Sequence, residues 1–192
     1  MSALIRLGAD GPHHAGALPD GAFKPGAGPF PPVDPTRPNG GQGDGRTKSK
    51  PNIAWPTDPG VTRWEGGAYL RLADWLAAPV DGAAIVLMPT DDPLALAGRT
   101  AGLAHIAVDF ARFSDGRGLS TARLLRERIG WTGEIRAVGD VILDLLFYMS
   151  RCGFDAFALR SDQSVEAALG AFATFPQVYQ PAADARPEPV PA

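Results

Sequence analysis

Between residues 83 and 175, short apolar segments alternate with segments that carry a helical pattern. The apolar segments, residues 83–88, 105–110, 134–138 and 154–159, have the length and composition of strands buried on both faces. Helices are predicted at residues 92–103, 121–129 and 141–151, and after the last strand to about residue 175. Strands joined by helices pair in parallel through right-handed crossovers. The sequence therefore predicts an α/β fold of four parallel strand-helix repeats.

Two architectures satisfy this pattern. One is a half (βα)-barrel-like arrangement, which a partner would complete, and the other is a small doubly wound sheet. In both, functional side chains gather at the carboxyl ends of the strands. The pattern leaves the choice between them open.

The prolines divide the chain unevenly. Eleven of the 19 prolines fall in the first 60 residues, and none lies between residues 94 and 175. We therefore predict a disordered, largely irregular Pro/Gly-rich segment over residues 1–60 with a short strand near residues 4–7, an α/β domain over 61–180, and a disordered tail over 181–192. A chain of 192 residues is long enough for one such domain.

Capping residues define the expected helix ends. Asp92 followed by Pro93 is typical of a helix start, and Asp140 is expected to cap the helix at 141–151. Gly130 is expected to end the second helix, and Gly153 is expected to be the left-handed residue after the third.

Composition excludes several classes of protein. A net charge of −3 and a pI near 5.6 disfavour a nucleic-acid partner. The single cysteine, Cys152, allows no intrachain disulfide and no thiolate metal cluster, and no metal site is expected. We expect no signal peptide and no membrane span, and the sequence carries no flavin, nicotinamide or iron–sulfur signature. We therefore expect a cytoplasmic protein with no cofactor.

One loop stands out as a candidate binding site. Two glycines flank Arg117 just before a helix, which favours a tight turn whose backbone N–H groups face an anion. Arg136 is expected to add a second guanidinium at the same rim. The alternative is a structural Asp-Gly turn in which Arg117 pairs with Asp115 or Asp109. No catalytic residue is assigned, and the candidate oxyanion site comprises Asp109, Asp115, Gly116, Arg117, Gly118, Ser120, Arg136 and Asp140.

A second candidate surface is an interface. The helix at 141–149 is apolar nearly all round, so it lies in the core or against another subunit. Arginines of the preceding helix lie away from its apolar face. The candidate interface residues are Arg123, Arg126, Leu145, Phe147 and Tyr148.

Four blocks together resemble a known bacterial family. They are FSDGRGLS (113–120), ARLLRER (122–128), GEIRAVGD (133–140) and RCGFDAF (151–157). In this order they are similar to domain-of-unknown-function family nine hundred thirty-four, which is described as an oxidoreductase involved in sulfite reduction. The resemblance covers roughly residues 80–181. Leu145 departs from it, because the family pattern has a polar Gln there.

The resemblance implies a role in sulfate assimilation toward cysteine. The first hypothesis is an accessory protein or subunit of the assimilatory sulfite reductase system that binds the sulfite reductase hemoprotein. The alternative is a small enzyme or ligand-binding protein with a site for sulfite, sulfate or a sulfonucleotide. A third hypothesis is a homo-oligomer in which two half-barrels close against each other. Whether the protein is itself an enzyme stays open.

Overall fold

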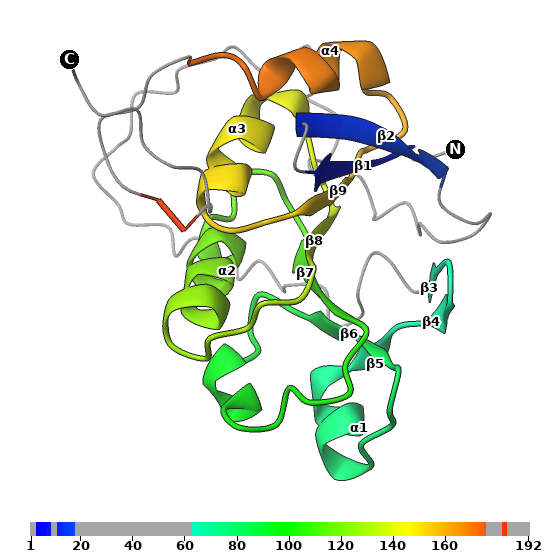
Figure 1. Ribbon diagram of the computed structural model, residues 1–192, viewed down its shortest axis with the longest axis vertical. Coiled ribbons are helices and arrows are strands. Elements are labelled where there is room, and N and C mark those ends of the chain that lie inside the picture. The colour runs from blue at the N-terminus through cyan, green and yellow to red at the C-terminus, as the bar shows by residue number, and fades with distance from the viewer. Residues whose placement is uncertain (1–2, 9–10, 18–62, 176–181, 184–192) are drawn as a thin grey trace, which may run out of the picture.

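The computed structural model describes residues 3–8, 11–17, 63–175 and 182–183 (Figure 1). Its main element is a seven-stranded sheet with the order β2-β1-β9-β8-β7-β6-β5. Five neighbouring strands, β5 to β9, are parallel and follow one another in chain order. The α/β fold with a mostly parallel sheet is therefore confirmed.

The four predicted strands are present with small changes at their ends. They are β6 (Ala84–Leu87), β7 (His105–Phe110), β8 (Ile135–Gly139) and β9 (Ala156–Ala158), and every residue in them is buried. A fifth parallel strand, β5 (Leu70–Arg71), extends the sheet beyond β6. Burial on both faces explains why their sequences are almost continuously apolar.

The helices differ more from expectation. The chain forms α1 (Leu72–Ala77), α2 (Arg117–Glu127), α3 (Leu143–Arg151) and α4 (Val165–Ala171). The helix expected at 92–103 is only a 3-10 turn, η1 (Pro93–Leu96), although Asp92 does cap it by accepting the Leu94 N–H at 2.9 Å. Gly98 and Gly102 adopt positive φ of 69° and 82°, which ends helical geometry. Gly153, at φ 103°, follows α3 as predicted.

The described helices pack on one face of the sheet. In Figure 1, α2 and α3 lie on the side of the strands opposite the small hairpin formed by β3 (Arg63–Trp64) and β4 (Gly67–Ala68). One hydrophobic cluster joins the strands to Leu72, Leu96, Leu125, Leu146 and Ala168, one residue from each helix. A doubly wound sheet reverses its strand order and carries helices on both faces. The consecutive order is that of the half-barrel-like alternative.

The other face of the sheet carries a second hydrophobic cluster, in which half of the buried residues are alanine. Its hydrophobic cluster is separate from the first and consists of Leu4, Tyr69, Ala84, Val86, Ala107, Val138, Ala156 and Ala158. Trp64 of the β3–β4 hairpin packs against it.

The N-terminal residues belong to the same sheet. The short strand expected near residues 4–7 is β1 (Ala3–Gly8), which pairs antiparallel with β9. The prediction of no regular structure after residue 7 is wrong for β2 (Gly11–Ala17), which pairs with β1. The segment 18–60, and most of the tail at 181–192, lie outside the described residues. No helix among the described residues is long and apolar enough to cross a membrane.

Candidate functional site

Asp140 joins the loops at the carboxyl ends of three strands. Its Oδ2 accepts the backbone N–H of Phe113 at 2.9 Å, and its Oδ1 accepts a hydrogen bond from Arg160 Nη1 at 2.6 Å. Asp140 was expected to cap α3, but the Leu143 N–H of that helix donates instead to Gln163 Oε1 at 3.2 Å. The role of Asp140 is therefore to hold the rim loops together.

Arg117 is held by Asp115 in the same rim. Its Nη2 lies 2.7 Å from Asp115 Oδ2, and its Nε and backbone N–H donate to Oδ1 at 3.0 and 3.1 Å. The hydrogen bond from Arg117 outweighs burial and lowers the pKa of Asp115. Helix α2 begins at Arg117, four residues before the expected start at residue 121. This geometry is the structural turn that the sequence left as the alternative.

The two glycines that flank Arg117 have different surroundings. A Cβ on Gly118 would lie 2.7 Å from Cζ of Phe110, whereas a Cβ on Gly116 would meet nothing within 4 Å. Ser120 is exposed on the first turns of α2. Gly118 therefore lets α2 pack closely on the end of β7.

The structure separates Arg136 from Arg117. Arg136 is the second residue of β8, and its guanidinium binds Glu134, which precedes the strand. Arg117 instead follows the carboxyl end of β7. The expectation that both arginines serve one rim site is therefore not met. Asp109 lies near the carboxyl end of β7, and it is buried with 1% of its surface exposed.

Arg136 belongs to an ionic cluster on the sheet face that faces the hairpin. Its Nη1 lies 2.9 Å from Glu65 Oε2, and its Nη2 lies 2.7 Å from Glu134 Oε1. Arg6 of β1 binds Glu134 at 2.8 Å and Glu65 at 3.6 Å. We call these four residues the Arg6–Arg136 cluster. Arg6, Glu65 and Glu134 were not predicted as site residues from the sequence.

Three aromatic rings adjoin this cluster, and those of Tyr69 and His105 are buried. His105 Nε2 and the Tyr69 hydroxyl lie 2.9 Å apart, and the Trp64 ring meets the His105 ring edge-on at 4.8 Å between centroids. Burial and the charge of Arg136 lower the pKa of His105 to about 4. Burial also raises the pKa of Tyr69. His105 is therefore neutral at pH 7.

The arginines proposed for an interface have different roles. Arg123 is exposed and forms an i, i+4 ion pair with Glu127. Arg126 is half-buried, and its guanidinium donates to the carbonyl oxygens of Trp131, Gly133 and Gly153 at 2.6–3.0 Å and to Asp155. Arg126 thus ties together three of the four sequence blocks that carry the family resemblance.

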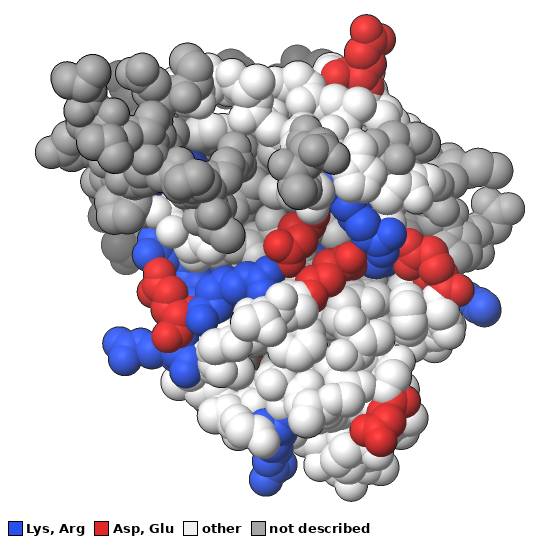
Figure 2. All heavy atoms as spheres, viewed as in Figure 1, with Lys and Arg blue, Asp and Glu red and all other residues white. Residues whose placement is uncertain are grey.

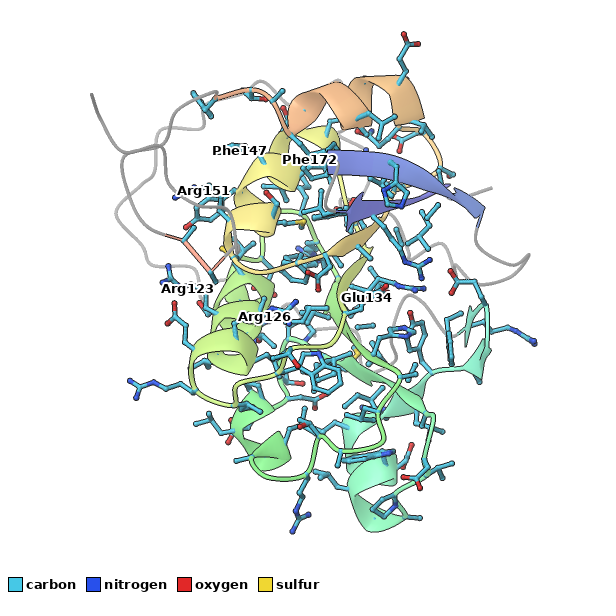
Figure 3. All side chains as sticks on the ribbon, in the orientation of Figure 1. Arg123, Arg126, Glu134, Phe147, Arg151 and Phe172 are labelled. Atoms are coloured by element: carbon cyan, nitrogen blue, oxygen red, sulfur yellow. The ribbon has the colours of Figure 1, made fainter. Side chains whose placement is uncertain are left out.

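The surface formed by α2 and α3 carries aromatic side chains. Tyr148 is 56% exposed, while the Phe147 ring packs against Phe175 at 5.2 Å between centroids. Leu145 is half-buried and packs against the core. Figure 3 shows Arg123 and Arg126 on α2, Phe147 and Arg151 on α3, and Glu134 on the other side of β8.

Charges on the molecule are interleaved. Figure 2 shows acidic and basic side chains in contact along a band across the middle of the visible face. Within the described residues, no group of three or more His, Cys, Asp or Glu side chains is arranged to hold a metal ion.

Comparison with known proteins identifies one family. The model of the family described as "Bacterial protein of unknown function (DUF934)" matches residues 84–190, more than half of the chain. No protein with a curated description and no solved structure matches.

Proposed function

This chain belongs to the bacterial DUF934 family, and we propose that it is an accessory subunit of the assimilatory sulfite reductase system. In this role it binds the sulfite reductase hemoprotein in the cytoplasm. The support for sulfite reduction is the resemblance carried by the four blocks between residues 113 and 157. The blocks cover α2, β8, the end of α3 and most of β9, together with residues just before α2 and β8.

The observation that favours partner binding is the mixed arginine and aromatic surface of α2 and α3. Tyr148 exposes more than half of its surface, and its side chain lies near that of Arg123 on the neighbouring helix. Tyrosine and arginine are the side chains that most often dominate the binding energy of protein interfaces. An exposed tyrosine beside an exposed arginine is therefore the best-supported contact point for the hemoprotein.

Co-purification tests this proposal. Tagged full-length protein, expressed at its normal level in cells of its source organism grown on sulfate, is expected to enrich the hemoprotein over an untagged control. Tyr148→Ala and Arg123→Glu are expected to reduce the recovered hemoprotein at least tenfold, because truncating an interface hot spot costs about 2 kcal/mol or more. Arg71→Glu reverses an exposed charge at the far edge of the sheet and serves as the matched control. Failure of the tagged protein to enrich the hemoprotein would refute the proposal.

The oxyanion-binding alternative has less support at the rim. Arg117 is bound through two of its nitrogens by Asp115, and Arg160 is bound by both Asp140 and Asp162. The hydrogen bonds from Arg160 lower the pKa of Asp162 to about 2. Each of these guanidinium groups is paired with a carboxylate only two residues away in the same loop, which is the pattern of a structural turn.

A further inference from the structure

The register of the sheet places two arginines on either side of one alanine. Arg6 of β1 and Arg136 of β8 are both paired with Ala156 of β9, which lies between them. Residues paired in this way project from the same face of a sheet, and adjacent strands lie about 4.8 Å apart. The two guanidinium groups therefore face a common space above a small side chain. This arrangement lies on the face opposite the helices, away from the rim that holds Arg117.

The two glutamates of the cluster are held differently. Glu134 directly precedes β8, is less exposed, and binds Arg136 at 2.7 Å and Arg6 at 2.8 Å. Glu65 lies in the turn between β3 and β4, which form a separate sheet of two residues per strand. Its side chain is 40% exposed and reaches Arg136 at 2.9 Å and Arg6 at 3.6 Å. Glu65 is thus the carboxylate of the cluster that belongs to the hairpin and not to the main sheet.

Removal of the Glu65 carboxylate would leave the charges of the cluster unbalanced. The cluster holds two arginines and two glutamates, so its net charge is zero. Without the Glu65 carboxylate, two arginines face Glu134 alone, and the cluster has one excess positive charge. The Arg136 side chain is only 1% exposed, so water compensates its charge poorly. The space left by Glu65 would therefore favour a small anion.

We propose that Arg6 and Arg136 form a binding site for a small oxyanion, and that the Glu65 carboxylate occupies this site from within the same chain. The ligand class is an anion with at least two oxygens at carboxylate spacing, which the arginine fork recognises. Binding of such an anion displaces Glu65 and moves the β3–β4 hairpin, so that Trp64 leaves the ring of His105. This proposal does not depend on the hemoprotein as a partner.

The lowered pKa of Glu65 is consistent with a carboxylate that occupies an anion site. Partial burial raises its pKa, but the hydrogen bond from Arg136 and the charges of Arg136 and Arg6 prevail and hold the pKa below its usual value. The carboxylate therefore stays ionised at neutral pH and competes with any free anion. A tethered group acts at an effective concentration in the millimolar range or above, so the wild-type site is largely closed to weak ligands.

Thermal unfolding of Glu65→Gln tests the proposal. Full-length wild-type and variant proteins are heated in sodium formate, sulfite or sulfate, against sodium chloride of equal ionic strength. Formate is the closest stand-in for the glutamate side chain. Near one hundred times its dissociation constant, an anion that binds the vacated site is expected to raise the Tm of the variant by about 5 °C. The Tm of wild type is expected to change by less than about 1 °C in formate.

Two further variants separate a specific site from general salt effects. Glu127→Gln also releases an arginine, Arg123, from an ion pair, but at an exposed site. It reports the stabilisation that sulfate gives to any protein through exclusion from the surface. The double variant Glu65→Gln/Arg6→Gln is expected to lose the anion-dependent rise in Tm.

Glu65→Asp, with a shorter carboxylate, is a second route if Glu65→Gln does not fold. It is expected to show a smaller rise in Tm in formate.

The outcomes decide the proposal in either direction. A formate-dependent gain in Glu65→Gln that vanishes in the double variant supports the site. Equal shifts in wild type, Glu127→Gln and Glu65→Gln overturn it, as does a variant that responds to none of the three anions.

Discussion

At the scale of single residues, His105 makes stability depend on pH. Its pKa is lowered from 6.5 to about 4 in the folded protein by burial and by the charge of Arg136. Between these values the unfolded chain binds a proton that the native chain does not, so stability falls as pH falls from about 6.5 to 4. A shift of this size corresponds to about 3 kcal/mol at most.

Urea unfolding at pH 7, 5.5 and 4.5 measures this contribution. His105→Gln is expected to flatten the loss of unfolding free energy between pH 6.5 and 4.5, while His13→Gln changes an exposed histidine of β2 and serves as the control. Glu65, Glu134 and Asp115 have lowered pKa values, so the stability that their carboxylates contribute is also lost as the pH falls. This part of the pH dependence is expected in both variants. An unchanged slope in His105→Gln would show that His105 titrates normally.

Arg126 and Arg123 provide a matched pair one helical turn apart. Arg126→Ala removes hydrogen bonds to three carbonyl oxygens and leaves Asp155 without its guanidinium, so it is expected to lower the unfolding free energy by about 2–3 kcal/mol. Arg123→Ala removes an exposed i, i+4 pair and is expected to cost about 0.5 kcal/mol. Chemical denaturation of both variants compares these costs. Equal costs would contradict a structural role for Arg126.

At the scale of elements, the glycines around Arg117 separate packing from ligand binding. Gly118→Ala is expected to destabilise the protein by about 1–3 kcal/mol, because the added Cβ collides with the buried ring of Phe110. Gly116→Ala is expected to change stability by less than about 0.5 kcal/mol, since its φ is −76° and the space around it is open. Denaturation midpoints of both variants are the measurement. A larger loss for Gly116→Ala than for Gly118→Ala would be evidence for a strained loop.

The sequence predicted the strands that consist of one short, continuous apolar segment. The parallel strands β6 to β9 are almost wholly apolar. This is the pattern expected of parallel strands that are buried on both faces. Strand β2 was missed because Gly11, Pro12 and Gly16 indicate turns. Proline is tolerated there because β2 lies at the edge of the sheet.

The site was harder to predict than the strands. The rim pairs Asp115–Arg117 and Arg160–Asp162 are two residues apart and are accessible to local reasoning. In the Arg6–Arg136 cluster, the hydrogen bond from Arg6 to Glu134 joins residues 128 positions apart. The order of the strands brings them together, and no local pattern encodes that order. One part of this surface could be predicted from the alternation of side chains along a strand. His105 and Arg136 occupy positions that project from the same face of the sheet.

At the scale of the whole molecule, the N-terminal strand is part of the parallel sheet's core. Ile5 has none of its surface exposed and belongs to the larger hydrophobic cluster, and Leu4 lies in the cluster on the other face. β1 also pairs with β9, so without β1 the hydrogen-bonding groups of β9 form a bare edge. The family match begins at residue 84, yet the sheet is closed at β9 by residues from the start of the chain.

A chain that begins at residue 61 is therefore expected to fold poorly, even though it contains every parallel strand. The loss of β1 removes two buried aliphatic side chains, and it exposes a strand edge that favours aggregation. Purification yield, size-exclusion profile and thermal unfolding of this truncation would be compared with the full chain. Ile5→Ala in the full chain isolates the packing contribution and is expected to cost about 2–5 kcal/mol, whereas Val80→Ala, at an exposed apolar residue, is expected to cost less than about 0.5 kcal/mol. A truncated protein that is monomeric and as stable as the full chain would show that β5 to β9 form an independent unit, and that β1 only covers an edge already stable without it.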